Sequence, residues 1–268
     1  MVAELRELYR YRQLVWTLTA RDLKARYRGS FLGYFWSLAN PLLLLGVYTL
    51  VFGYLLKGIR GIEPYPLFLF AGILPWTFFA GSVMEATGAI SANAGLVKKV
   101  MFPAETLPLV VVASHLVHFA LAMPILLLAL LIAVVLGKAA ITPLILLAPV
   151  YMLVQAVFVA GIALMVASSS VIFRDLRDLI ANLLNLGFFL TPILYPITEP
   201  TIAKSAALKT LIRLNPMTPF VVAYQSIFVF GTLPPWIDAL LMVLYAAISI
   251  LLGFAVFDRL RDTLAEVL

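Results

Sequence analysis

The sequence has little charge and no cysteine. Charged residues make up 12% of its 268 residues, which is about half of what a soluble domain carries. Hydrophobic residues account for 63%, and the mean hydropathy is +1.06. This leaves too little polar surface to cover a water-soluble globule, so we expect lipid to solvate much of the chain. The absence of cysteine excludes disulfides, thiolate metal sites and cysteine nucleophiles.

Several local patterns are also missing. The first 30 residues have no continuous apolar core and no small-residue cleavage site, so we expect no signal peptide. No GxxxxGK sequence followed by Ser or Thr occurs, so the chain has no phosphate-cradling loop of its own. No carboxylate lies deep within an apolar run, as proton-coupled transporters usually require. Glu85 and Glu105 come nearest, at the edges of such runs.

Long charge-free runs make up most of the remaining sequence. A helix needs about 20 apolar residues to cross the hydrocarbon layer, and six runs reach or approach that length. They are apolar at odd and even positions alike, which is not the alternation of barrel strands. The sequence therefore predicts an all-α polytopic membrane protein with six transmembrane helices. The six runs are Leu32–Leu56, Pro64–Met84, Thr106–Gly137, Ala139–Phe173, Leu179–Thr198 and Ala239–Phe257.

The distribution of basic residues predicts the topology. With six spans, 13 of the 19 Lys and Arg residues fall on the side that holds both chain ends. Because basic residues gather in cytoplasmic loops, we expect a cell inner membrane protein with cytoplasmic N- and C-termini. A seventh charge-free stretch, Asn215–Ile237, is interrupted by prolines, and Phe220–Phe230 within it is too short to span. We expect a re-entrant periplasmic hairpin there, covered by protein or by a water-filled cavity.

These segments form one predicted transmembrane domain, 1–268. Its parts are an interface helix (1–30), helices one to five (31–197), an external re-entrant region (198–236), helix six (237–257) and a cytoplasmic tail (258–268).

Two cytoplasmic segments have patterns of their own. Trp16, Ala20, Leu23 and Tyr27 recur every four residues between basic positions, which favours an amphipathic helix in the headgroup plane. A solvated lead-in helix is the alternative. After the second run, a short stretch combines apolar and cationic side chains before a proline, which is typical of a docking element for another protein. An ordinary loop with two lysines is the alternative. The residues that we expect to dock are Leu96, Lys98, Lys99, Phe102 and Pro103.

The two histidines, His115 and His118, lie three residues apart in the third run and share a helix face. Two ligands without nearby acids or thiols make a weak metal site. We therefore expect no metal here, and interpret the pair as polar contacts between helices or as the lining of a wet cavity. Gln155 in the fourth run has the same interpretation.

Aromatic residues are dense in the first and fifth runs. Part of this density is the interfacial belt of membrane proteins. Aromatic faces also stack on the apolar faces of sugar rings, so a path lined by them would suit a polysaccharide. The candidate channel residues are Tyr34, Phe35, Trp36, Tyr48, Phe52, Phe188, Phe189 and Tyr195.

Five blocks of the sequence resemble the membrane subunits of ABC-2 type exporters of cell-surface polysaccharides, with the O-antigen exporter permeases the most similar. The blocks cover nearly the whole chain in order. They are ARYRGSFLGYFWSLANPLLLLGVYTLVF (Ala25–Phe52), FAGILPWTFFAGS (Phe70–Ser82), LVKKVMFPAETLPL (Leu96–Leu109), FRDLRDLIANLLNLGFFLTPILYP (Phe173–Pro196) and LNPMTPFVVAYQ (Leu214–Gln225). The last block usually ends in Arg, where this sequence has Gln225.

The resemblance implies a permease homodimer served by two copies of a separate ATP-binding cassette subunit, which would hold the ATP and Mg²⁺. It implies that the segment from Leu96 to Pro103 docks on that subunit, and that the first and fifth spans line a channel at the dimer interface. The cargo would be a lipid-linked polysaccharide, with membrane lipid around the chain and no nucleic acid. Teichoic acid and capsule exporters share these blocks, and a lipid or drug exporter of the superfamily is a further alternative. A membrane-embedded glycan enzyme lacks the buried acids it would need, and a membrane scaffold without transport activity is equally disfavoured.

Overall fold

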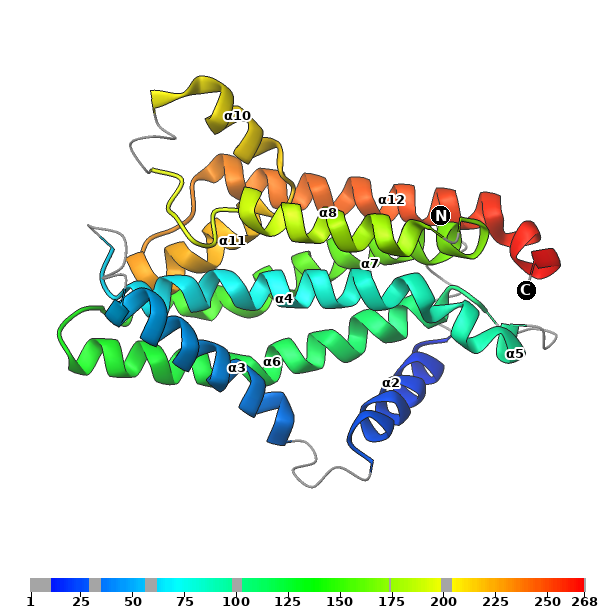
Figure 1. Cartoon of the computed structure of the whole chain (residues 1–268), viewed down its shortest axis with the longest axis horizontal. Coiled ribbons are helices and arrows are strands. Elements are labelled where there is room, and N and C mark those ends of the chain that lie inside the picture. Colours follow the sequence, from blue (N-terminus) through cyan, green and yellow to red (C-terminus); the bar gives the residue numbers. More distant parts are fainter. Residues whose placement is uncertain are drawn as a thin grey trace.

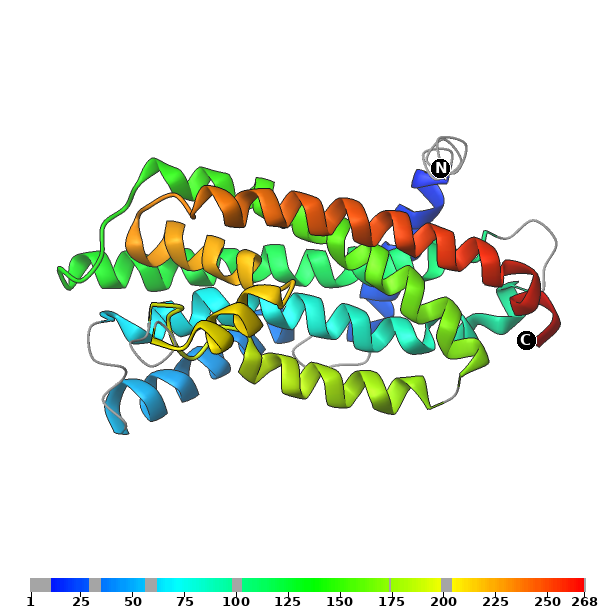
Figure 2. The same ribbon diagram turned by 90° about the horizontal axis from the view of Figure 1, so that it is seen from above.

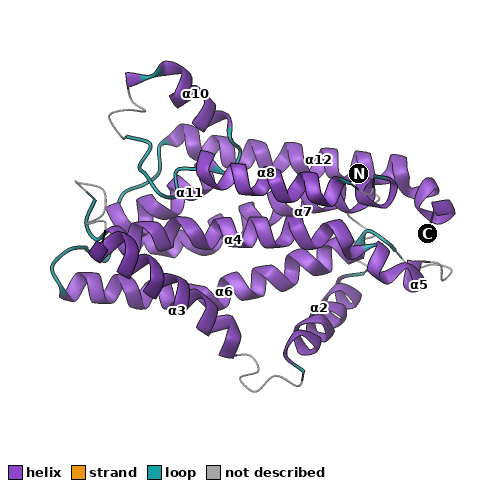
Figure 3. Cartoon of the chain, in the orientation of Figure 1, coloured by secondary structure: helices purple, strands orange, loops and turns teal. Residues whose placement is uncertain are grey.

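The computed structural model describes residues 11–28, 35–55, 62–97, 103–173, 175–198 and 204–267. Helices account for most of these residues, which contain no strand (Figure 3). The all-α prediction is therefore confirmed for the part of the chain that is described.

Four long helices form the body of the molecule, and within the described residues they are the four that are long and apolar enough to cross a membrane. They are α4 (Tyr65–Ala89), α6 (Thr106–Val135), α7 (Ala148–Ile172, preceded by the 3₁₀ turn η4, Pro143–Leu147) and α12 (Trp236–Val267). Each corresponds to a predicted run. Helices α4, α7 and α12 run in the same direction along the bundle, and α6 runs opposite to them (Figures 1 and 2). We call the end where α4, α7 and α12 finish the α5 end, and the opposite end the α10 end.

Two of the predicted runs form shorter helices. The first gives α3 (Trp36–Tyr48), which continues as the π-helix η2 (Thr49–Leu55), and the fifth gives α8 (Leu176–Leu190). Helix α8 ends well before the predicted limit at Thr198. The cause is Pro192, because the residue before a proline is forced out of the helical region, and Thr191 is accordingly extended (φ −88°, ψ 138°). Six complete spans therefore stay a prediction.

The proline-interrupted stretch, Asn215–Ile237, contains a short helix that is buried along its whole length. It forms α11 (Thr218–Gln225) and the π-helix η5 (Ser226–Phe230), and α10 (Ala206–Leu214) precedes it. Helix α10 lies largely exposed at the α10 end, whereas every side chain of α11 is buried. Phe220 stacks on Phe158 of α7, and Tyr224 meets Phe119 of α6 edge-on. Protein thus covers this irregular segment, as its sequence requires, while its re-entrant position in a membrane stays a prediction.

Helices α7 and α12 cross unusually closely. A Cβ added to Gly161 would lie 2.2 Å from the carbonyl carbon of Ser249, and one on Gly253 would lie 2.5 Å from the carbonyl oxygen of Gly161. Only glycine permits backbones to approach in this way. The Ser249 hydroxyl donates a hydrogen bond across the same crossing to the Phe158 carbonyl, 3.0 Å away.

Two predicted boundaries differ at the α5 end. Helix α12 continues through most of the predicted tail 258–268, so that region is helical to Val267. Near the N-terminus, the predicted interface helix is present as α2 (Arg12–Tyr27). It packs beside α6, at an angle to the bundle (Figure 1).

Candidate functional site

The docking segment is only partly described. Helix α4 passes through the 3₁₀ turn η3 (Ser91–Asn93) into the four-residue helix α5 (Ala94–Val97), which carries Leu96. Lys98, Lys99 and Phe102 lie outside the described residues. Pro103 is buried, and its carbonyl accepts hydrogen bonds from the amide and the hydroxyl of Thr106, 3.0 and 2.7 Å away. Pro103 therefore begins the turn that leads into α6.

Helix α5 is anchored to the ends of two long helices. Val97 packs on a small apolar cluster formed by Ala89 of α4 and by Leu107 and Val111 of α6. Val97 thus contacts α4 and α6 at the same point.

The aromatic candidates fall on separate elements. Phe35 and Trp36 are exposed at the start of α3, and Tyr48 is half-buried at its end, against the core. Tyr34 and the side chain of Phe52 lie outside what the structure describes. The structure therefore does not bring the α3 and α8 sets together into one closed channel within this part of the chain.

The candidates of α8 form a cluster with α4. Phe188 is half-buried and meets Trp76 edge-on at 6.0 Å between ring centroids. Phe189 is 65% exposed, and its carbonyl accepts a hydrogen bond from the Tyr195 hydroxyl, 2.8 Å away. Gly187 allows the approach of α8, because a Cβ there would touch the Trp76 ring at 3.0 Å. Phe188 thus has a packing role, whereas Phe189 faces outward.

The residues predicted to form one apolar face of the N-terminal helix differ in their exposure. Trp16 is 72% exposed, Leu23 is half-buried, and the Tyr27 side chain lies outside the described set. The packed face of α2 instead carries Thr19, which is buried. The position of this helix relative to lipid headgroups stays a prediction.

Four side chains from three helices form what we call the charge network. On α2, the Arg26 Nε donates to an Asp22 carboxylate oxygen, 2.9 Å away. The same guanidinium reaches across to the Glu85 carboxylate on α4. The other Glu85 oxygen lies 2.8 Å from His115 Nε2 on α6. Glu85 therefore joins α2, α4 and α6 through its two oxygens.

The charges in this network are arranged for mutual stabilisation. Burial of the guanidinium favours its neutral form, but the hydrogen bonds to Asp22 and Glu85 outweigh that effect and raise the pKa of Arg26. Arg26 is consequently a permanent cation between two carboxylates. The network is partly open to solvent, since the side chains of Arg26, Glu85 and His115 are 28%, 37% and 20% exposed.

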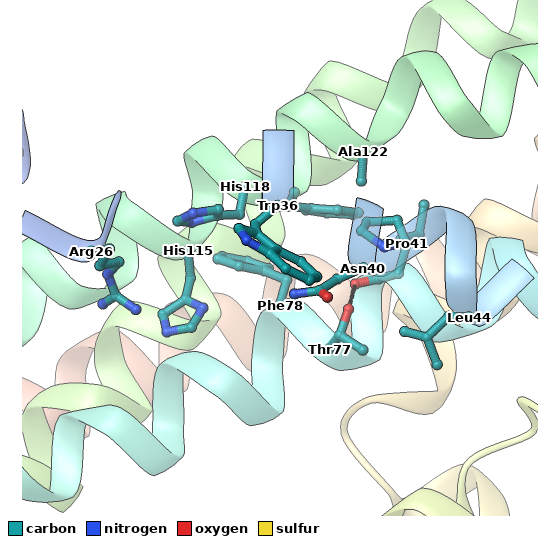
Figure 4. Close-up of a pocket in the computed structure, with 12 residues that line it drawn as sticks. Arg26, Trp36, Asn40, Pro41, Leu44, Thr77, Phe78, His115, His118 and Ala122 are labelled. Atoms are coloured by element: carbon teal, nitrogen blue, oxygen red, sulfur yellow. Dashed lines mark hydrogen bonds between the residues drawn. The ribbon is translucent and has the colours of Figure 1, made fainter. Parts of the chain in front are cut away.

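Two cavities adjoin the charge network. One of about 320 Å³ lies between α2, α3, α4 and α6 (Figure 4). Arg26 and the two histidines stand at one side of it, and Pro41 and Leu44 at the other. The second, of about 460 Å³, lies between α2 and the α5 end of α4 and α6, and is lined in part by Asp22, Glu85 and Asn93. The network forms the partition between these two spaces.

The buried polar residues behave as the sequence predicts. His115 makes a contact between helices and lines a cavity, and Gln155 Nε2 donates to the Pro75 carbonyl of α4, 2.8 Å away. His118 Nδ1 lies 2.8 Å from the Ser114 carbonyl and therefore donates to it. Gln225, in the position where the resemblance expects Arg, donates to the Pro192 carbonyl at 3.0 Å. It thereby ties α11 to the segment that follows α8.

Sequence reasoning missed the central role of Arg26 and Glu85. Arg26 contributes only to the charge count, and Glu85 is noted only for its place at the edge of a run. The spacing of Asp22 and Arg26, four residues apart, is a local signal for an ion pair on a helix. No local pattern connects Arg26 with Glu85, because the two are 59 residues apart in the chain.

Comparison with known proteins gives the same family from end to end. The family model of the ABC-2 type transporter matches residues 13–229. The chain is 40% identical to the O-antigen export system permease protein RfbA of Myxococcus xanthus, over 99% of both chains. It is 31% identical to the protein of the same name from Klebsiella pneumoniae, over 95% of both chains. A shorter match of 83 residues, 34% identical and covering 30% of this chain and 31% of the relative, links it to the polysialic acid transport protein KpsM of Escherichia coli. The chain therefore belongs to the ABC-2 type transporter family, and is a multi-pass membrane protein.

Proposed function

We propose that the chain is the permease subunit of an ABC transporter that exports a lipid-linked cell-surface polysaccharide, of the O-antigen class, across the cytoplasmic membrane. The observation that carries this proposal is the 40% identity to an O-antigen export permease over 99% of both chains.

ATP hydrolysis is assigned to a separate subunit. The family implies an ATP-binding cassette partner, and the sequence has no phosphate-cradling loop. The α5 end is the surface that this partner would contact. It carries the docking segment from Leu96 to Pro103, whose α5 part is anchored through Val97. We propose two copies of the ATP-binding subunit for each pair of permeases.

In the proposed topology the α5 end is cytoplasmic and the chain crosses the membrane six times. Helix α3 with η2 covers Trp36–Leu55, a length sufficient to span, while α8 with its 15 residues reaches about 22 Å and crosses most of the hydrocarbon layer. Both chain ends would then be cytoplasmic. The stretch from α10 to η5 would enter from the periplasmic side and return.

A homodimer is proposed from the outer face of α8. No residue of α8 is buried within this chain. Its exposed stripe combines Leu179, Leu183 and Leu186 with the amides of Asn182 and Asn185, and neither amide bonds to another described residue. Amides at membrane depth need partners or water. A second copy, or the polar path between two copies, would supply them, and Phe189 would line that path.

Capsule polysaccharide is the second candidate cargo. It is favoured by the similarity to the polysialic acid transport protein KpsM over 83 residues. This match covers 30% of the chain, against 99% for the O-antigen permease, so O-antigen is the first choice.

The proposal is tested by purification and complementation. The tagged chain should hold an ATP-binding subunit through purification, and ATPase activity should appear only with that subunit present. In cells deleted for their own O-antigen permease, the chain and its partner should restore polysaccharide to the surface. ATP hydrolysis by the chain alone would contradict the proposal. Restoration of capsule but not of O-antigen would favour the second candidate, and transport of lipids or drugs without any polysaccharide would reject both.

A further inference from the structure

Helix α2 contacts the bundle mainly along α6, and few of its side chains are buried there. Among the α2 side chains that the structure describes, Thr19 alone is buried, and its hydroxyl donates to Val15 of the same helix. The two cavities of about 320 and 460 Å³ lie on either side of its contact with α4. Well-packed interfaces leave no spaces of that size. Helix α2 therefore has room to pivot about the charge network.

Glu85 is the residue that holds α2 in place against α4 and α6. It accepts from Arg26 of α2 with one carboxylate oxygen and faces His115 of α6 with the other. Asp22 also contacts Arg26, but it belongs to α2 and so adds no link to the bundle. Removing the charge of Glu85 would release α2, whereas removing the charge of Asp22 would not.

The charge network lies one helical turn from the anchor of α5. On α4, Glu85 precedes Ala89 by four residues, and on α6, His115 follows Val111 by four. Residues four apart are neighbours on one helix face. Ala89 and Val111 are members of the cluster that holds Val97 of α5. A displacement of α5 therefore reaches Glu85 and His115 through a single turn of each helix.

We propose that Glu85 is a positioning residue that makes α2 follow the docking helix α5 through its contact with Arg26. The inference rests on the proposed function, in which the α5 end receives the force of the ATPase. When α5 is displaced, the network carries α2 with it. Without Glu85, α2 pivots in the two cavities and the movement of α5 is not passed on to it.

The first experiment separates transport from ATP hydrolysis in the assembled complex. Glu85→Gln should lower polysaccharide export at least tenfold while the ATPase rate of the complex stays within twofold. The matched control is Asp22→Asn, which removes a carboxylate from the same guanidinium but keeps the link between helices. Its export should stay within twofold of the parent. Equal losses in the two variants, or unchanged export by Glu85→Gln, would overturn the inference.

Charge reversal distinguishes positioning from simple loss of structure. The double variant Arg26→Glu with Glu85→Arg restores an ion pair across the same gap. It should recover at least a third of the lost export. If Glu85→Gln fails to fold, Arg26→Gln breaks the same link and should show the same uncoupling. A double variant that folds but does not recover polysaccharide export would contradict the proposal.

The second experiment does not depend on cargo. The chain has no native cysteine, so spin labels attach only at Gln13→Cys on α2 and Ser91→Cys on η3, both exposed positions. In the reconstituted chain, the distance distribution between the labels should be narrow in the parent and with Asp22→Asn. It should become at least twofold broader with Glu85→Gln and narrow again on charge reversal. An unchanged width with Glu85→Gln would refute the inference, whereas a parent complex that exports no polysaccharide would refute only the proposed function.

Discussion

Helices α8 and α12 both turn wide apolar faces away from the bundle, yet the two faces differ in composition. The exposed stripe of α12 contains only hydrocarbon side chains over its central part, Leu240, Val243, Leu244, Ile248, Leu251 and Leu252. That of α8 places Asn182 and Asn185 between Leu179, Leu183 and Leu186. Lipid tails satisfy the first face but not the amides of the second.

Their inner faces differ as well. Helix α12 meets α7 at backbone contact through Gly161 and Gly253. Helix α8 buries none of its side chains and touches α4 chiefly through Phe188 and Gly187. The two exposed faces are therefore held differently. Helix α12 is fixed against α7 at backbone contact, and α8 contacts the bundle only loosely, as the proposed homodimer requires.

The largest expected effect comes from the close crossing. Gly253→Ala or Gly161→Ala places a methyl group within 2.5 Å of backbone that cannot move aside. We expect the free energy of unfolding to fall by about 3 kcal/mol, the upper end of typical overpacking costs. The melting temperature in detergent should be much lower. The control is Gly46→Ala on α3, where a Cβ meets nothing within 4 Å. It should stabilise by up to about 1 kcal/mol. Equal melting temperatures for the variants would refute the crossing.

The second effect tests the outer face of α8. Replacing Asn182 and Asn185 together by Leu should reduce export at least tenfold without lowering the melting temperature, because the amides serve the facing copy or the path and not the fold of this chain. Leu251→Val on α12 is the matched control and should leave export unchanged. Normal export by the double variant would show that α8 faces lipid as α12 does.

The third effect separates the two neighbouring rings of α8. Phe189→Ala should lower export severalfold with little change in stability, since its ring is exposed. Phe188→Ala removes the ring contact with Trp76 and should cost about 1 kcal/mol in addition. Export assays combined with thermal melting of both variants measure the difference. Identical profiles would mean that both rings only pack.

The smallest effect is expected at Gly187 of α8. A Cβ there lies 3.0 Å from the end of the Trp76 ring, which is a side chain and can shift. The gain in helix propensity of up to about 1 kcal/mol offsets the crowding. We expect Gly187→Ala to change the melting temperature hardly at all, in contrast to Gly253→Ala. A loss as large as that of Gly253→Ala would mean that α8 is held as tightly as α12.

The long helices could be predicted from the sequence, because an apolar run of that length satisfies its backbone hydrogen bonds in lipid most simply as a helix. The predicted start of α6 at Thr106 is the observed one, and its end differs by two residues. The end of α8 was missed although Pro192 marks it, since apolarity continues through Ile193 and Leu194 while helicity does not. Apolar composition indicates which residues avoid water. It does not indicate where the backbone hydrogen bonds of a helix end, which at α8 is set by Pro192.

The candidate site was less predictable for a physical reason. Each group of aromatic or docking candidates lies within a short segment of the chain. The residue types in that segment are therefore enough to identify it. The contact of Arg26 with Glu85 depends on how α2 lies against α4, which side-chain periodicity does not determine. The observed face of α2 carries Thr19 and Arg26 toward the bundle and leaves Trp16 exposed. The apolar stripe predicted for contact with lipid headgroups does not indicate which face of α2 meets α4.

The crossing of α7 and α12 has a consequence for biosynthesis. Helix α12 follows all the other described helices in the chain, so the ribosome delivers it last. Until it inserts, the small-residue groove around Gly161 has no occupant and the Phe158 carbonyl lacks its bond from Ser249. The contact between α7 and α12 therefore forms only after α12 has been synthesised. A nascent chain arrested before Trp236 would expose this groove to membrane proteases and quality-control factors, so export-competent protein and intact α12 should appear together in the cell.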